Sequence, residues 1–215
     1  MKILFVVTDD TKKKQKETMD MLSNLLPDIK KTGDKITHLN VENDLYYTSI
    51  PKVQGTFDYV MLLKGTVKLA NNFRTIIEEH MIAPRTLEDG KVEKQIYLPL
   101  VVLTNEKMRG VLNSTLWNSN LAPEVGILEH DLAIKQLDTT LYGALVPYDV
   151  IFNESYYKPE LKYYQHFHIL NKFTKDEKNV VFGIPKTLLF TDVDLSFSTA
   201  SNDEKIAQFK LAKEI

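Results

Sequence analysis

Residues 1–22, MKILFVVTDDTKKKQKETMDML, decide the fold. Ile3 to Val7 is a continuous apolar run without alternation, which is typical of a strand buried on both faces. Met19 and Leu22 continue with Leu25 and Leu26 at three- and four-residue spacing, which predicts an amphipathic helix. The strand passes into the helix through two aspartates, a threonine and a lysine cluster. A buried strand that runs into a helix in this way predicts an α/β protein.

The next hundred residues repeat this alternation. Strands are predicted over 35–41, 57–63 and 96–103, and helices are predicted around 69–80 and over 108–117. Such alternation favours a parallel sheet with helices on both faces and right-handed crossovers. We therefore expect a three-layer, doubly wound parallel α/β fold.

The C-terminal third is less regular. Residues 140–152 predict a strand in which Pro147 marks a strand end or a sheet edge. The aromatic-rich segment 156–173 predicts a helix after Pro159, and 180–190 predicts one or two short strands. No internal repeat or low-complexity linker separates these segments from the rest.

A last helix is predicted over 203–215, with Ser201 or Asn202 as its N-cap. We expect one domain, in which residues 1–150 form the α/β core. Residues 151–215 are expected to form a C-terminal elaboration packed on the same domain.

Composition limits the classes of function. The 215 residues are 43% hydrophobic and 26% charged, as in ordinary globular proteins. A formal charge of −2 argues against a nucleic-acid binder, and no apolar run is long enough to cross a membrane. The absence of cysteine excludes thiolate chemistry and cysteine-bound metals, and it favours a cytoplasmic location.

Architecture predicts where a small-molecule ligand would bind. In an open parallel sheet, ligands bind beyond the carboxyl ends of the strands. Three polar loops leave such ends: TDDTKKKQKE from residue 8, KGTVKLANN from residue 64 and TNEKMRG from residue 104. Each carries lysine, threonine or asparagine side chains that can contact an anion.

The order and spacing of these elements resemble the flavodoxin-like superfold, and within it the NAD(P)H-dependent FMN and quinone reductases. The resemblance implies FMN as the cofactor that carries the hydride. It also implies a flavin phosphate in the first loop and the flavin ring between the other two loops. The residues at the matching positions are Thr8, Thr11, Lys12, Lys64, Gly65, Thr66, Thr104 and Asn105.

A second hypothesis is a non-catalytic binding, assembly or regulatory module. The first loop has no glycine, and Asp9 and Asp10 would repel a phosphate there. MKILFVVTDD, FDYVMLLKG and LPLVVLT also resemble a response-regulator receiver. Lys64 or Leu63 stands where a receiver has its phosphoacceptor aspartate, so a pseudo-receiver without phosphotransfer is expected on this hypothesis.

Three further patterns were weighed against ordinary structural roles. TDVD at 191–194 resembles the DxD metal site of nucleotide-sugar transferases, but a solvated strand end is the favoured interpretation. His166 and His168 diverge on a helix, so we expect no shared metal. The aromatic cluster of residues 156–167 is expected to pack in the core, with a ligand cover or a homodimer interface as alternatives.

Overall fold

The computed structural model describes residues 1–8, 12–25, 32–38, 56–104, 110–112, 115–117, 123–125, 141–161, 164–176, 178–192 and 201–214. The helices are α1 (Lys12–Leu25), α4 (Phe73–His80), α5 (Tyr148–Ile151), η1 (Glu154–Tyr156), α6 (Gln165–Lys175) and α7 (Asn202–Lys213). The strands are β1 (Ile3–Val7), β2 (Lys35–His38), β3 (Tyr59–Leu63), β4 (Val67–Leu69), β5 (Lys94–Leu103), β6 (Gly110–Leu112), β7 (Thr115–Trp117), β8 (Pro123–Val125), β9 (Leu145–Pro147) and β10 (Asn179–Thr191).

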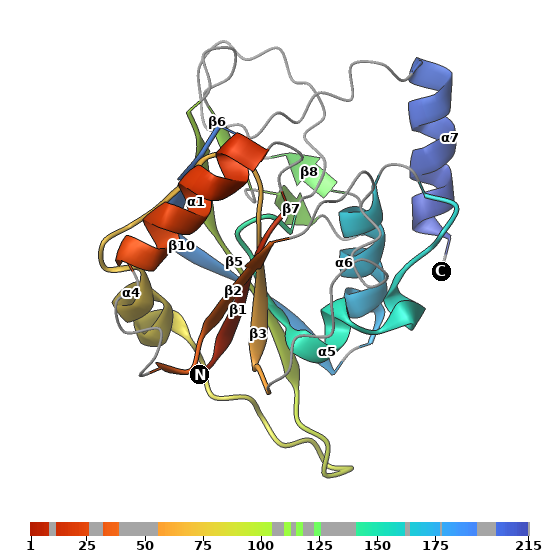
Figure 1. The fold of residues 1–215 in the computed structure, drawn as a ribbon. Helices are drawn as coiled ribbons and strands as arrows, with labels where there is room; N and C mark the ends of the chain where they lie inside the picture. The colour runs from red at the N-terminus through yellow and green to blue at the C-terminus, as the bar shows by residue number, and fades with distance from the viewer. Residues whose placement is uncertain are drawn as a thin grey trace.

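The architecture is mixed α/β, as the sequence predicts at that level (Figure 1). The main sheet has the order β2-β1-β3-β9-β5-β10-β4, and β6 pairs with β5 beside this path. β1 pairs in parallel with β2 and β3, and β10 pairs in parallel with β5. β7 and β8 form a separate two-stranded sheet.

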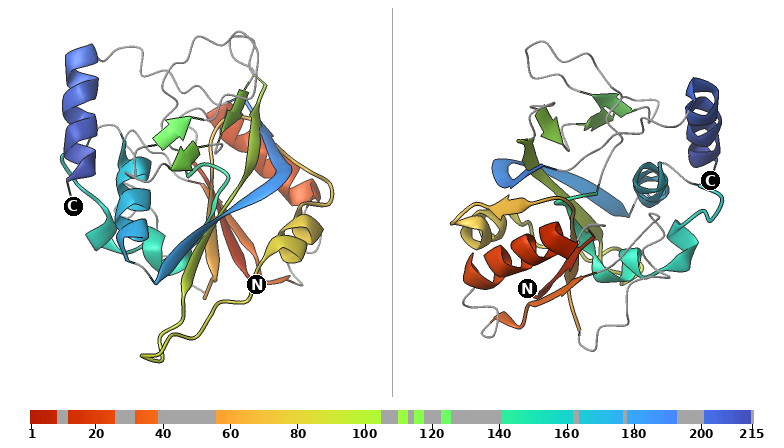
Figure 2. Two further views of the ribbon diagram at one scale, coloured as in Figure 1. Left: turned by 180° about the vertical axis from the view of Figure 1, so that it is seen from behind. Right: turned by 45° about the horizontal axis from the view of Figure 1, so that its top comes forward.

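Alternating residues of the buried strands serve two different cores. Ile3, Phe5 and Val7 of β1 belong to one apolar cluster, to which α1 and α4 contribute. Leu4 and Val6 belong to the other cluster, to which α5 and α6 contribute. Figure 2 shows these two pairs of helices on opposite sides of the central strands. The unbroken apolar runs are therefore explained by burial on both faces.

The connection from β3 to β4 forces the sheet to curl. Four strand spacings of about 4.8 Å would separate β3 from β4 in a flat sheet, about 19 Å in total. Only residues 64–66 join the two strands, and a chain from Leu63 to Val67 reaches at most about 14 Å. β4 nevertheless pairs with β10 at the far end of the order. The sheet must therefore bend to bring β4 back toward β3.

The prediction of a purely parallel sheet is wrong. β9 enters between β3 and β5 and is antiparallel to both, and β4 is antiparallel to β10. Gly143 makes the β9 entry close-packed, because it has φ +77° and a Cβ there would lie 2.7 Å from Val101 Cγ2. Pro147 ends β9, as predicted, but it does so inside the sheet and not at its edge.

A second correction concerns the helix predicted over 108–117. In its described parts, residues 110–112 and 115–117 are the strands β6 and β7. Periodicity alone does not distinguish a helix from a strand in a short apolar run. Here β6 pairs with β5 and β7 pairs with β8, so both segments are strands. Residues 179–191, which fall in the predicted elaboration, form a strand within the main sheet.

The C-terminal helix is confirmed with its cap. Ser201 has extended backbone angles, and its side chain accepts a hydrogen bond from the Glu204 amide at 3.2 Å. Phe209 of α7 packs against Tyr164 and Phe167, with ring centroids 5.4 and 5.1 Å apart. No helix in the described ranges is both long and apolar enough to pass through a membrane.

Candidate functional site

The candidate site is built on the connection Leu63–Val67, which we call the pinned loop. Three consecutive carbonyl oxygens of this loop each accept a hydrogen bond from a threonine hydroxyl of a different element. The bonds run from Thr8 Oγ1 to the Leu63 oxygen (3.1 Å), from Thr191 Oγ1 to the Lys64 oxygen (2.6 Å) and from Thr18 Oγ1 to the Gly65 oxygen (3.0 Å). The ends of β1 and β10 and the middle of α1 thus converge on one five-residue segment.

The next two amides of the pinned loop are held as well. The Thr66 amide donates to Asp192 Oδ1 at 2.5 Å, and the Val67 amide donates to Thr18 Oγ1 at 3.2 Å. Asp192 also pairs with Lys14 Nζ at 3.5 Å. Backbone groups fixed by three buried threonines and the partly buried Asp192 have little freedom to rearrange, so the loop is preorganised.

Lys64 is the charged group that this loop presents. Its ammonium lies 5.8 Å from the centroid of the Tyr142 ring, within the range of a cation–π contact. Among the described residues, no carboxylate pairs with this ammonium. Gly65 follows with φ +81°, a left-handed conformation that glycine adopts without strain. A half-buried cation with no carboxylate partner in the described part of the chain favours the approach of an anion.

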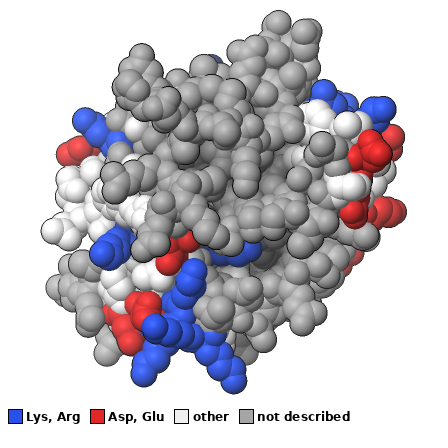
Figure 3. All heavy atoms as spheres, turned by 90° about the horizontal axis from the view of Figure 1, so that it is seen from above, with Lys and Arg blue, Asp and Glu red and all other residues white. Residues whose placement is uncertain are grey.

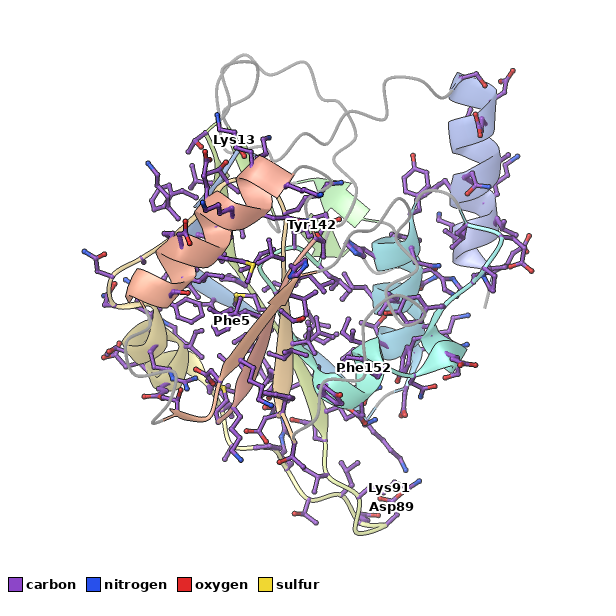
Figure 4. All side chains as sticks on the ribbon, in the orientation of Figure 1. Phe5, Lys13, Asp89, Lys91, Tyr142 and Phe152 are labelled. Carbon is purple, nitrogen blue, oxygen red and sulfur yellow. The ribbon has the colours of Figure 1, made fainter. Side chains whose placement is uncertain are left out.

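Tyr142 is fixed beside β3 by backbone contacts. It forms an isolated bridge with Leu62, and the Gly143 amide donates to the Leu62 carbonyl at 2.8 Å. The His166 ring meets the Tyr142 ring edge-on at 4.9 Å, and its Nδ1 accepts a hydrogen bond from the Leu141 amide at 3.1 Å. Figure 4 shows Tyr142 near the upper, carboxyl end of the central strands.

The pinned loop lies where open α/β sheets bind ligands. β2 and β3 flank β1 on opposite sides, so the chain changes direction across the sheet between β1 and β3. Ligands bind at the carboxyl ends of strands at such a switch point. Figure 3 looks down on this end of the molecule, where Lys and Arg side chains gather along one side of the face. Lys12, Lys13 and Lys16 of α1 are exposed.

The structure brings together five of the eight residues predicted to contact a cofactor. Thr8, Lys64, Gly65 and Thr66 meet at the pinned loop, and Thr104 joins them through Thr191. The Thr104 amide and hydroxyl both contact the Thr191 carbonyl, at 2.8 and 3.2 Å. Their role as ligand contacts stays a prediction.

The other three predicted residues are not part of this network. Lys12 is the exposed first residue of α1. Thr11 and Asn105 lie outside the described residues. Five of the predicted residues thus lie at the same end of the strands, but the sequence did not predict the hydrogen bonds that they make.

Thr8 and Thr66 do not fit the phosphate-binding role predicted for them in a flavin site. Thr8 is 3% exposed, and both its amide and its hydroxyl donate to the Leu63 carbonyl. The Thr66 amide already bonds the Asp192 carboxylate, whose charge would repel a phosphate. Any anion at this edge would therefore be bound by the lysines and not by these threonine donors.

Sequence reasoning missed Thr18 and Tyr142 and misjudged Asp192. No local pattern distinguishes Thr18 from any other threonine on a helix, since its partners lie 47 and 49 positions away. Asp192 was expected to be solvated, but it accepts a hydrogen bond from an amide 126 positions away. Asp194, the second acid of that motif, lies outside the described residues.

The histidine pair is structural. His166 and His168 point to different partners, as predicted, and within the described residues no group of three metal-binding side chains occurs. His168 Nδ1 lies 2.9 Å from the Ala212 carbonyl, so this nitrogen carries a proton. Burial lowers the pKa of His168. This contact holds the end of α7 against α6.

Three described members of the aromatic cluster pack in the core, and Tyr156 is partly buried against it. Tyr157, Tyr164 and Phe167 are each less than a tenth exposed, and the Tyr157 hydroxyl donates to the Ile151 carbonyl at 2.8 Å. Tyr163 lies outside the described residues. The core interpretation is confirmed for these three side chains.

Comparison with known proteins gives little beyond this geometry. No protein family matches the sequence, and no curated protein matches it. Among solved structures, a crystal structure of TarS from S. aureus is similar, with a TM-score of 0.48 and 14% sequence identity. The similarity covers 98% of this chain and 38% of the TarS chain.

Proposed function

We propose that this protein binds a small molecule at the carboxyl ends of its central strands. The small molecule carries a phosphate or another anionic group. Lys64 is the charged anchor, and the ring of Tyr142, which is 8% exposed, lies beside it. The observation that carries the proposal is the Lys64 ammonium, held on the pinned loop at the switch point with an aromatic ring as its described partner. Mononucleotides and dinucleotides combine such an anionic group with a planar ring.

The flavin-dependent NAD(P)H reductase predicted from the sequence is the narrower form of this proposal. FMN would bring both a phosphate and a ring, but the donors predicted for its phosphate, Thr8 and Thr66, are engaged elsewhere. Purified protein that gains visible flavin absorbance with FMN and oxidises NADPH would support the narrower form.

A melting-temperature panel tests the broader proposal. The probes are inorganic phosphate, pyrophosphate, FMN, NADPH, ATP and a UDP-sugar, each with and without Mg²⁺. A probe at a hundred times its Kd raises the melting temperature by about 5–10 °C. Lys64→Met should remove at least half of that shift, whereas Lys68→Met, an exposed lysine on β4, should keep it.

A second candidate is the non-catalytic binding or assembly module. It is favoured by the use of Thr8, Thr66, Thr191 and Asp192 in internal hydrogen bonds, because such groups stabilise a fold without serving a ligand. This candidate predicts that no probe of the panel raises the melting temperature. An equal shift in wild type and Lys64→Met would count against the proposed anchor.

A further inference from the structure

We infer that Thr18 is a positioning residue for the Lys64 site, acting through the backbone of the pinned loop; this inference rests on the function proposed above. The hydrogen bonds of Thr18 go to the loop backbone and not to the Lys64 ammonium. It instead bonds the two peptide groups on either side of Thr66, and thereby fixes the turn that follows Lys64.

The hydrogen bonds of Thr18 are unusual for its place in a helix. It lies in the middle of α1 and is fully buried. A buried threonine in a helix ordinarily bonds the carbonyl four residues earlier. Ser23 of the same helix follows that pattern and bonds the Met19 carbonyl at 2.8 Å. Thr18 bonds across to the pinned loop.

Thr18 is also used differently from the other two threonines of the network. The hydroxyls of Thr8 and Thr191 each donate to one loop carbonyl. Thr18 donates to the Gly65 carbonyl and accepts from the Val67 amide, so one hydroxyl closes both sides of the turn. Without it, a buried carbonyl and a buried amide would both lose a partner.

Gly65 explains why the loop needs these two hydrogen bonds, which we call the Thr18 clamp. Its left-handed φ is accessible to glycine together with many alternatives, so glycine alone does not select one loop conformation. Fixing a residue in one backbone conformation costs about 1–2 kcal/mol of conformational entropy. Two hydrogen bonds to one rigid, buried side chain provide a stabilisation of that order.

The first measurement is hydrogen exchange of the Val67 amide by NMR, which needs no ligand. In Thr18→Val this amide should exchange at least about 10-fold faster than in wild type, because its acceptor is gone. Thr18→Ser keeps the hydroxyl and should restore protection to within about 3-fold. Ser23→Ala, on the same helix, should leave the Val67 amide unchanged.

The second measurement is the affinity for pyrophosphate by calorimetry. Thr18→Val should bind it about 10-fold more weakly than wild type, and Thr18→Ser should restore binding. Val67 exchange unchanged in Thr18→Val would overturn the inference, as would unchanged affinity in a protein whose Val67 amide has been freed.

The two proposals fail in different ways. If wild type binds no probe while Thr18→Val still frees the Val67 amide, the proposed function fails and the clamp remains. If Thr18→Val does not fold, Thr18→Ala gives the same comparison, because it removes the hydroxyl without a branched replacement. Val67 protection equal to wild type in folded Thr18→Ala would then overturn the inference.

Discussion

The two ends of the central strands are held together by different chemistry. At the amino end, the Asp34 carboxylate accepts a hydrogen bond from the Ile3 amide at 2.7 Å and pairs with Arg74 at 3.0 Å. At the carboxyl end, the Asp192 carboxylate likewise bonds a backbone amide and pairs with Lys14, but three threonine hydroxyls also bind the loop carbonyls. The amino end therefore pairs a buried carboxylate with Arg74, whereas at the carboxyl end the Lys64 ammonium lies beside the Tyr142 ring, and no described carboxylate pairs with it.

The largest effect is expected at the amino end. Asp34→Ala leaves the Arg74 guanidinium partly buried without its main partner and should lower the free energy of unfolding by about 3 kcal/mol. Asp34→Asn keeps an acceptor for the Ile3 amide and should cost about half as much. Urea unfolding of the three proteins measures both. A loss below about 1 kcal/mol in Asp34→Ala would contradict the role given to this pair.

A smaller effect is expected at the carboxyl end. Thr191→Val leaves the Lys64 carbonyl without its hydroxyl donor and should lower the free energy of unfolding by about 1.5 kcal/mol. Thr191→Ser retains the donor and should lose less. The same urea series measures this difference. Equal losses in the two variants would mean that the methyl group, and not the hydroxyl, holds this end.

His168 extends the comparison to a group that titrates. Because the pKa of His168 is lowered in the folded protein, the unfolded chain binds the proton more tightly. Stability should therefore fall as the pH drops from about 7.5 to about 5.5, below the usual histidine pKa. The groups around His168 are the Ala212 carbonyl, Lys158 and Lys172, and the two lysines act in the same direction as burial.

The test is the melting temperature as a function of pH. His168→Gln keeps a donor for the Ala212 carbonyl and should show a flatter pH dependence than wild type. His38→Gln, an exposed histidine on β2, is the matched control and should follow wild type. Parallel curves for wild type and His168→Gln would assign the pH dependence to other groups.

The smallest effect is expected at the exposed tip of the connection between α4 and β5, which Figure 4 shows at the bottom of the molecule. Hydrogen bonds from the Lys178 side chain and the Lys91 amide lower the pKa of Asp89 to about 2. The stability this provides is present at neutral pH and is lost as the pH falls from 3.8 toward about 2. Asp89→Asn should still melt like wild type at neutral pH, because exposed ion pairs contribute little. A clear decrease in melting temperature would show that the ion pair matters.

The sequence predicted the parts of the fold that depend on local pattern. β1, β3 and β5 were found because burial on both faces leaves unbroken apolar runs, and the α7 cap was found because Ser201 carries a local signal. The direction of β9 and the curl of the sheet were not predictable, because they depend on contacts between residues far apart in the chain.

The candidate site also contains residues that the local sequence predicted and residues that it did not. Lys64 and Thr104 were predicted because they follow strand ends directly. Thr18 and Asp192 could not be assigned, because their partners on the pinned loop lie 47 to 126 positions away. A hydroxyl or carboxylate that bonds so distant a backbone group leaves no periodic signal in its own neighbourhood.

The three-residue connection between β3 and β4 also has a consequence for the order of folding. β4 follows β3 directly along the chain, yet its partner strand ends at Thr191, and the Lys64 carbonyl is bonded by a residue 127 positions later. Contacts of such high sequence separation form late, since the intervening chain must first be brought together. We therefore expect the candidate site to be completed late in folding, after the strand that ends at Thr191 has joined the sheet.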